Sequence, residues 1–243
     1  MLRVDLNCDM GEGMETDAAI FPFISSANIA CGYHAGDPDT MRRTVELALR
    51  HHVAIGAHPS YSDRANFGRI DILGKTLQPE EIPGMIVDQL ILLQGICDEF
   101  GARLHHVKPH GALYNRAAKD AVVSQLICRA IREFDPSLLL YGLSGSAMKS
   151  AAAQQGLRFV SEVFADRTYQ ADGTLTPRTE PDALITDAEQ SVRQALRFLH
   201  PQPQNPLPAE TICLHGDGDH ALEFAQTIHD ALLLEGIAIQ APD

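Results

Sequence analysis

The sequence is poor in cysteine and in basic residues, and it has no long apolar run. Its five cysteines form no C-x-x-C pair, and an odd number at wide spacing is not a disulfide framework. We therefore expect reduced thiols and a cytoplasmic protein. No stretch approaches the roughly 18 apolar residues of a membrane span. The first residues, MLRVDLNCDMGEG, lack the apolar core of a secretory signal.

Basic residues are outnumbered by acidic ones, 19 Lys and Arg against 32 Asp and Glu, which gives a formal charge of −13. Such a chain is a poor candidate for binding nucleic acid or an anionic membrane, because both carry negative charge. At 243 residues with 45% hydrophobic residues, the chain is long enough to bury one large core. We expect a single domain over residues 1–243.

Several familiar catalytic motifs are also missing. Residues 68–76, GRIDILGKT, resemble a Walker A loop but place five residues between the glycines instead of four, and they follow a loop. We therefore expect no nucleotide cradle there. No G-x-S-x-G or H-E-x-x-H motif is present, so a zinc site would need ligands from separate strands, such as Asp9, His58 and His110.

Apolar strand patterns and helical patterns alternate about seven times along the chain. This order is typical of parallel strands joined by crossover helices. Strands are predicted at residues 2–6, 26–32, 53–57, 104–109, 138–143, 158–163 and 211–214, with a possible short strand at 237–239. Helices are predicted at residues 40–50, 79–100, 118–134, 146–156, 188–200 and 220–234.

The two faces of these strands differ in character. Asp5, Asn7 and Asp9 share one face of the first strand, and Val4 and Leu6 lie on the other. Other strands repeat this division between a small or polar face and an apolar face. An open doubly wound sheet would be apolar on both faces, whereas a barrel with outer helices can have a polar interior. A β/α barrel is therefore favoured, with its polar residues converging at the carboxyl ends of the strands.

Residues 104–114, LHHVKPHGALY, are the richest in titratable groups. Alternation places His106, Lys108 and His110 on one side of an extended chain, while Pro109 ends the strand and Gly111 allows a tight turn. We interpret the segment as a strand that opens into an active-site loop. The alternative is a buried strand whose histidines bond to the backbone, with Lys108 in a structural ion pair with Asp5 or Glu162.

Other strand ends carry further candidates. Asn7, Asp9 and Glu12 could bind a metal, act as a base or hold a substrate amide, or they could simply bond their own loop. His34 is a possible general acid or base, and His58 stands among small residues that leave it needing a partner or a ligand.

A long loop after the sixth predicted strand combines acidic and basic residues. It is flanked by Glu162, Asp166, Arg167 and Arg178. Arginines there could clamp a carboxylate or a phosphate through paired hydrogen bonds. A solvated loop with ion pairs is the alternative.

Taken together, the strand-end motifs resemble those of a known family. NCDMGE, SANIACGYHAGDP, GAHPSYSD, HVKPHGALYN, EVFADRTY, DGTL-x-PR and HGD occur in this order, and the chain resembles the lactam-utilisation (LamB/YcsF) family from Val4 to about Ile239. The resemblance implies a seven-stranded parallel β/α barrel related to glycoside hydrolase and deacetylase barrels. It also implies one component of an enzyme that opens 5-oxoproline to glutamate with ATP hydrolysis, in complex with subunits B and C.

The resemblance also implies the site residues. They are Asn7, Asp9, Glu12, Asn28, His34, His58, Lys108, His110, Tyr114, Glu162, Asp166, Arg167, Arg178, His215 and Asp217. We expect Asp9, His58, Lys108 and His110 to be catalytic, with Asp9 as the base, and the others to bind substrate. Arg167 is expected to hold the substrate carboxylate.

ATP, with Mg²⁺, is the expected co-substrate, although the missing phosphate loop leaves its binding place open. A homo-oligomer is possible. Two other functions stay open: a metal-dependent amide hydrolase that acts alone, and a non-catalytic substrate-binding subunit.

Overall fold

The computed structural model describes residues 2–200, 209–216 and 220–243. Its strands are β1 (Arg3–Met10), β2 (Ser26–Ala30), β3 (Ala54–His58), β4 (His106–Val107), β5 (Leu139–Leu143), β6 (Phe159–Phe164), β7 (Thr211–Leu214) and β8 (Ala238–Ile239). The α-helices are α1 (Asp17–Ile20), α2 (Pro38–Arg50), α3 (Ile82–Glu99), α4 (Gly111–Lys119), α5 (Ala121–Phe134), α6 (Ala147–Gln155), α7 (Ala188–Leu199) and α8 (Ala221–Leu234). Short 3-10 helices are η1 (Phe21–Phe23), η2 (Arg64–Asn66) and η3 (Pro79–Glu81).

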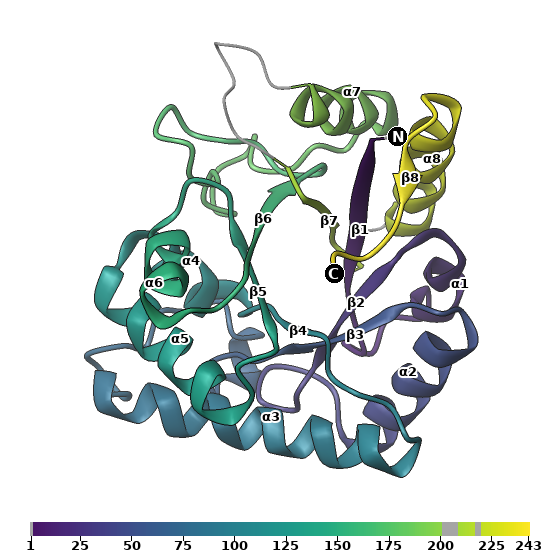
Figure 1. Cartoon of the computed structure of the whole chain (residues 1–243). Helices are drawn as coiled ribbons and strands as arrows, with labels where there is room; N and C mark the ends of the chain where they lie inside the picture. The colour runs from purple at the N-terminus through teal and green to yellow at the C-terminus, as the bar shows by residue number, and fades with distance from the viewer. Residues whose placement is uncertain (1, 201–208, 217–219) are drawn as a thin grey trace.

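Strands β1 to β7 close into a parallel barrel. Each pairs with the next in chain order, and β1 pairs with both β2 and β7. Figure 1 shows the strands as a ring with the helices outside it. Strand β8 lies outside this ring, parallel to the first residues of β1. The predicted seven-stranded β/α barrel is therefore confirmed, and so is the short final strand.

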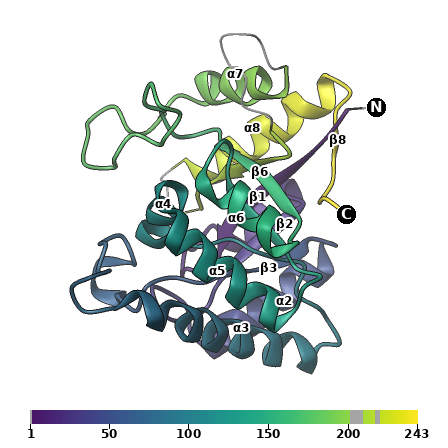
Figure 2. The ribbon, with the colours of Figure 1, turned by 60° about the vertical axis from the view of Figure 1, so that its left-hand side comes forward.

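The helices cover the barrel through apolar faces. In α2, Asp37 accepts a hydrogen bond from the Thr40 N–H at 2.8 Å and so caps the helix start. Met41 and Val45 are then fully buried at helical spacing. Figure 2 shows α2, α3 and α5 on one side of the barrel and α7 and α8 on the other. None of the helices that the structure describes is long and apolar enough to cross a membrane.

The predicted division between polar and apolar strand faces is present in β1. Val4 and Leu6 belong to the main apolar core, whereas Asp5 accepts hydrogen bonds from Ser26 and Thr211 on neighbouring strands. The polar face therefore points into the barrel, and it leads toward the carboxyl ends of the strands.

The element boundaries differ from the prediction in two places that matter for the site. Strand β1 continues to Met10, because Asn7 to Met10 pair with β2 in register. Residues after His110 form helix α4, where a loop was predicted. Gly111 begins α4 at φ +53°, and a Cβ there would lie 2.6 Å from the Gly68 carbonyl oxygen. Asp120 ends α4 and caps α5, which separates the two helices.

Candidate active site

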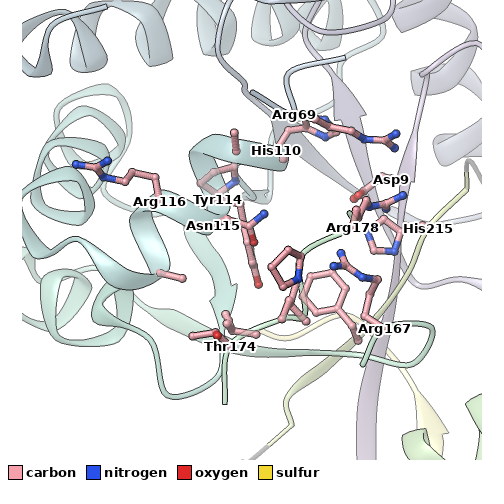
Figure 3. A pocket seen from close by; sticks show the side chains of 18 of the residues that line it. Asp9, Arg69, His110, Tyr114, Asn115, Arg116, Arg167, Thr174, Arg178 and His215 are labelled. Atoms are coloured by element: carbon pink, nitrogen blue, oxygen red, sulfur yellow. The ribbon is translucent and has the colours of Figure 1, made fainter. Parts of the chain in front are cut away.

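A cavity of about 630 Å³ opens at the carboxyl ends of the strands. Asp9 near the end of β1, His58 at the end of β3 and Lys108 just after β4 line one side of it. Helix α4 contributes Tyr114, Asn115 and Arg116, and Figure 3 shows Tyr114 and Asn115 facing the cavity, while the guanidinium of Arg116 points away from its centre. The loop after β6 contributes Arg167 and residues 174–179. The sequence-predicted convergence at this end of the barrel is therefore present.

Three histidines and a glutamate form a buried cluster beside this cavity. The ligand atoms of Glu12, His34, His58 and His110 all lie within 4.8 Å of one another. The rings of His34 and His110 stack at 3.8 Å, and Nδ1 of His110 lies 2.9 Å from Nε2 of His58. The carboxylate of Glu12 lies 3.0 Å from Nε2 of His34. These side chains could hold a metal ion.

This ligand set differs from the predicted one. Asp9 is not part of the cluster, although its Oδ2 lies 3.3 Å from Nε2 of His58. Glu12 and His34 complete the cluster because two turns approach closely. A Cβ on Gly36 would lie 2.9 Å from the Gly11 carbonyl oxygen. The sequence contains the glycines of these turns but no signal that the two turns meet.

Each histidine of the cluster is held through its second ring nitrogen. Nδ1 of His58 donates to the Lys108 carbonyl oxygen at 2.7 Å, and Nε2 of His110 donates to the Phe67 carbonyl oxygen at 2.9 Å. Nδ1 of His34 lies 2.9 Å from the Ser60 hydroxyl. Burial lowers the pKa of His34 to about 2 and the pKa of His110 well below its usual value.

Asp9 and Lys108 form a buried ion pair at the cavity wall. The Lys108 ammonium lies 2.8 Å from Asp9 Oδ1 and 3.1 Å from Glu162 Oε1. Burial opposes the charge on Lys108, but Asp9, Cys213 and Glu162 outweigh it and raise the pKa of Lys108 well above its usual value. Burial likewise raises the pKa of Asp9, but His58 and Lys108 more than offset this and hold that pKa well below its usual value. Both groups are therefore charged at neutral pH.

The alternative ion pair considered for Lys108 is thus present with Glu162. Asp5 lies deeper in the barrel, where its carboxylate is held by Ser25, Ser26 and Thr211. Burial raises the pKa of Asp5. It takes no part in the cavity wall.

Several predicted substrate-binding residues do not line the cavity. Asn28 donates to Asp9 Oδ1 at 2.9 Å and to Asn7 Oδ1 at 2.7 Å, and its own Oδ1 accepts from Nε2 of His106 at 2.8 Å. Asn7 donates to Glu162 Oε1 at 3.0 Å. These buried side chains lie behind the wall and fix the orientation of the groups that line it.

Tyr114 and Glu162 are joined directly. The Tyr114 hydroxyl donates to Glu162 Oε2 at 2.6 Å, and Tyr114 lines the cavity while Glu162 lies behind it. Glu162 therefore holds both Tyr114 and Lys108 in place.

On the far side of the cavity, Asp166 holds His215. Its carboxylate lies 2.8 Å from His215 Nδ1 and accepts from the His215 backbone N–H at 3.1 Å. His215 lines the cavity, and Asp166 does not. The predicted site residue Asp217 lies outside the described residues.

The two predicted arginines have different environments. Arg167 is buried and donates to the carbonyl oxygens of Thr176 at 2.6 Å and Ala183 at 3.2 Å, so its guanidinium holds the loop that closes one side of the cavity. Arg178 is exposed at the cavity rim. Burial and the nearby charge of Arg178 lower the pKa of Arg167 to about 10.

Three further cations line the cavity and were not singled out from the sequence. They are Arg69, Arg116 and Lys119. Two of them lie on α4: Arg116 falls in the segment predicted as a loop, and Lys119 falls at the start of the helix predicted at residues 118–134. Arg116 is paired with Asp71 at 3.1 Å and with Asp120 at 3.0 Å, and Asp71 also lines the cavity.

Comparisons with known proteins agree along the whole chain. A model of the LamB/YcsF family matches residues 4–243. The A subunit of 5-oxoprolinase from Bordetella pertussis is 53% identical over 250 residues, which cover 98% of each chain. The A subunit of the same enzyme from Tolumonas auensis is 50% identical and covers 99% of this chain and 100% of its own length.

Solved structures give a similar result. The crystal structure of a lactam utilization protein from Thermus thermophilus is 38% identical with a TM-score of 0.89, covering 99% of this chain and 100% of that one. A family 4 carbohydrate esterase from Streptomyces lividans is 13% identical with a TM-score of 0.51, covering 99% and 93%. This second similarity extends to the fold alone, and it agrees with the predicted barrel fold.

Proposed function

The chain belongs to the LamB/YcsF family, and from this we propose that it is the A subunit of a cytoplasmic 5-oxoprolinase. In this proposal it acts with subunits B and C to open 5-oxoproline to glutamate with hydrolysis of ATP. The names of the close relatives support the reaction and the existence of partner subunits. The observation that carries the chemistry is the ionised carboxylate of Asp9, held by Lys108 and Asn28 at the wall of the cavity.

The reaction needs an activated carbonyl, because a five-membered lactam is a resonance-stabilised amide and a poor electrophile. Transfer of the terminal phosphoryl group of ATP to the lactam oxygen releases ADP and makes the ring carbon electrophilic. Water then adds to that carbon and loses a proton to a base. The ring nitrogen takes up a proton and leaves, which gives an acyl phosphate, and a second water converts this to glutamate and phosphate.

We assign the base role to Asp9. Its carboxylate is ionised at neutral pH and lines the cavity, and its Oδ1 is engaged by Lys108 and Asn28, so Oδ2 is the oxygen that faces His58. General bases of this kind typically contribute about 10²–10⁴-fold to a rate. His58 and His110 lie next to Asp9 and are placed to exchange protons with the reacting nitrogen.

The cations of the cavity suit an anionic substrate. In this proposal Arg178, at the exposed rim of the cavity, binds the carboxylate of 5-oxoproline, and Arg167 holds the loop through its bonds to backbone carbonyls. Lys108 stabilises negative charge at Asp9 and at the reacting oxygen. Arg69, Arg116 and Lys119 favour the approach of phosphorylated species, with Mg²⁺ accompanying ATP.

The test is an ATP-dependent glutamate-release assay with the three subunits reconstituted. We expect Asp9→Asn and His110→Ala each to lower kcat by about 10²-fold or more while the complex still assembles. Lys149→Met, on the exposed surface of α6, is the matched control and should leave kcat unchanged. Normal turnover with Asp9→Asn would mean that this chain is a non-catalytic subunit.

A second candidate function is favoured by the cluster of Glu12, His34, His58 and His110. In a metal-dependent amide hydrolase, the chain alone would cleave amides in the presence of a divalent ion and without ATP. Assaying the isolated chain on simple lactams and N-acetylated sugars, with and without ATP, distinguishes the two functions. Release of product without ATP and without partner subunits would favour this second candidate.

A further inference from the structure

The hydrogen bonds of the histidine cluster show which ring nitrogens carry a proton and which have a lone pair. We consider His58 first. Nδ1 of His58 faces the Lys108 carbonyl oxygen at 2.7 Å. A carbonyl oxygen only accepts, so Nδ1 must carry the ring proton. Nε2 of a neutral His58 is then left with a lone pair, and it points at the cluster.

The same reasoning applies to His110. Its Nε2 faces the Phe67 carbonyl oxygen at 2.9 Å and must carry the proton. Nδ1 of His110 then has a lone pair, and it lies 2.9 Å from Nε2 of His58. Two neutral rings therefore present lone pairs to each other at hydrogen-bond distance, which is repulsive unless a positive charge lies between them.

His34 completes the pattern. The Ser60 hydroxyl donates to the Tyr61 carbonyl oxygen at 2.9 Å, so it accepts from Nδ1 of His34. Nε2 of His34 then directs a lone pair at Glu12 Oε1, 3.0 Å away. The same carboxylate oxygen lies 3.5 Å from Nδ1 of His110. Four acceptor atoms thus converge with no donor among them.

Protonating the histidines is an unfavourable way to relieve the repulsion between these acceptor atoms. The side chains of His34 and His58 are almost completely buried, and Glu12 and His110 are nearly so. Placing separate protons on these rings would bring positive charges within a few ångströms of one another, whereas one ion can satisfy all four lone pairs.

We propose that Glu12, His34, His58 and His110 together bind one divalent transition-metal ion of the Zn²⁺ type. Imidazole nitrogen with one carboxylate oxygen is a donor set that suits zinc. With metal–ligand bonds of about 2.0–2.1 Å, tetrahedral ligands lie about 3.3–3.4 Å apart. Three contacts in the cluster, of 2.9, 3.0 and 3.5 Å, are close to this spacing, and all four ligand atoms lie within 4.8 Å of one another.

The surroundings of the cluster also fit a metal site. Metal-bound histidines usually donate their other ring N–H to a carbonyl oxygen or another acceptor, as all three do here. Asp9 is not one of the four ligands: its Oδ1 is bonded to Lys108 and Asn28, and its Oδ2 lies 3.3 Å from Nε2 of His58. The ion would therefore lie beside the carboxylate that lines the cavity. This proposal does not depend on the 5-oxoprolinase reaction.

The test uses the full chain and the metal ions alone. The purified protein is stripped with a chelator and titrated with Zn²⁺ and with Co²⁺, whose visible absorption reports its ligand geometry. We expect one ion per chain by elemental analysis, a Co²⁺ spectrum of a four- or five-coordinate site, and a higher Tm with Zn²⁺ bound.

Variants assign the ion to the cluster. Glu12→Gln and His110→Ala should weaken Zn²⁺ binding on the order of a hundredfold or more, and Ser60→Ala, which keeps every ligand, should weaken it about 10–100-fold. His229→Ala is the control, since His229 lies by a separate pocket near the start of β3 and should leave binding unchanged. Circular dichroism of each metal-free variant shows whether it is folded.

Two results would overturn the proposal. One is a folded wild-type chain that takes up neither ion at millimolar concentration, which would mean that a shared proton resolves the lone-pair contacts. The other is equal binding by wild type, Glu12→Gln and His110→Ala, which would place the ion elsewhere. Neither result depends on an activity assay, so failure here is distinguishable from failure of the proposed reaction.

Discussion

The ammonium of Lys108 lies 2.8 Å from Oδ1 of Asp9 inside the barrel, and both side chains are nearly inaccessible to water. Glu162 lies on the other side of the same ammonium at 3.1 Å, with no exposed surface of its own. Two carboxylates thus share one cation. Removing that cation would leave negative charges buried together without compensation.

Lys108→Met is therefore expected to destabilise the protein by about 3–5 kcal/mol, the usual consequence of removing one partner of a buried ion pair. Methionine retains most of the side-chain volume, so the loss reflects charge rather than a cavity. Urea unfolding at pH 7 measures it. Lys149→Met removes an exposed lysine and should change stability by less than about 0.5 kcal/mol. Equal stabilities for the two variants would mean that the carboxylates take up protons at little cost.

A second prediction concerns the close contact between Gly56 and His106. A Cβ on Gly56 would overlap the His106 ring, which stacks on Tyr141 at 4.0 Å and donates to Asn28. Gly56→Ala should therefore displace the ring and break the bond to Asn28. We expect a loss of about 3 kcal/mol in stability, from overpacking together with a lost buried hydrogen bond.

The matched control is Gly95→Ala in α3, where an added Cβ meets nothing within 4 Å. A helix-interior glycine with free space should gain about 0.5–1 kcal/mol on becoming alanine. Urea unfolding of both variants separates the effects. Equal stability changes for Gly56→Ala and Gly95→Ala would show that His106 is free to move aside.

The barrel and the general location of the site could be predicted because both depend on alternation within single strands. Asp5, Asn7 and Asp9 sit on one face in any extended chain, and closure of the sheet turns that face inward. The pairing of Glu12 with His34 depends instead on two turns that meet in space. Sequence alone gives the glycines of those turns but not their approach.

Arg116 was missed for a different reason. Arg116 and Lys119 lie on α4, and both line the cavity. The helix follows directly on Pro109 and Gly111, which predict a turn. Its start depends on contacts between Gly111 and the distant Gly68, so tertiary packing overrides the local signal.

A third prediction concerns the pH dependence of stability through Asp17. Burial raises the pKa of Asp17 to about 6, although the Gly11 N–H, which donates to its Oδ2 at 2.9 Å, partly opposes this. The folded pKa lies above the unfolded value of about 3.9, so the folded state binds this proton more tightly. The stability contributed by the protonated Asp17 carboxyl is fully present below about pH 4. It is lost as the pH rises through about 6.

Asp17→Asn should remove this dependence, because its amide keeps an acceptor for Gly11 and has no charge to bury. The variant should be more stable than wild type by on the order of 2–3 kcal/mol at pH 7, and the difference should shrink toward pH 4. Urea unfolding at several pH values between 4 and 8 measures it. Asp88→Asn, at an exposed position of α3, should give a curve parallel to wild type. A constant difference between Asp17→Asn and wild type at all pH values would contradict the assignment.

Substitution of Arg178 should affect substrate binding, whereas substitution of Arg167 should affect stability and catalysis. Arg178 lies at the exposed rim of the cavity, so Arg178→Met should leave stability within about 0.5 kcal/mol of wild type. In the reconstituted complex it should raise KM for 5-oxoproline about 10–100-fold, since a charged hydrogen bond contributes roughly 1.5–3 kcal/mol.

Arg167→Met removes the bonds to Thr176 and Ala183, so it should lower both stability and kcat. Unfolding curves together with initial rates over a range of 5-oxoproline concentrations separate the two effects. An unchanged KM for Arg178→Met would exclude Arg178 as the residue that binds the substrate carboxylate.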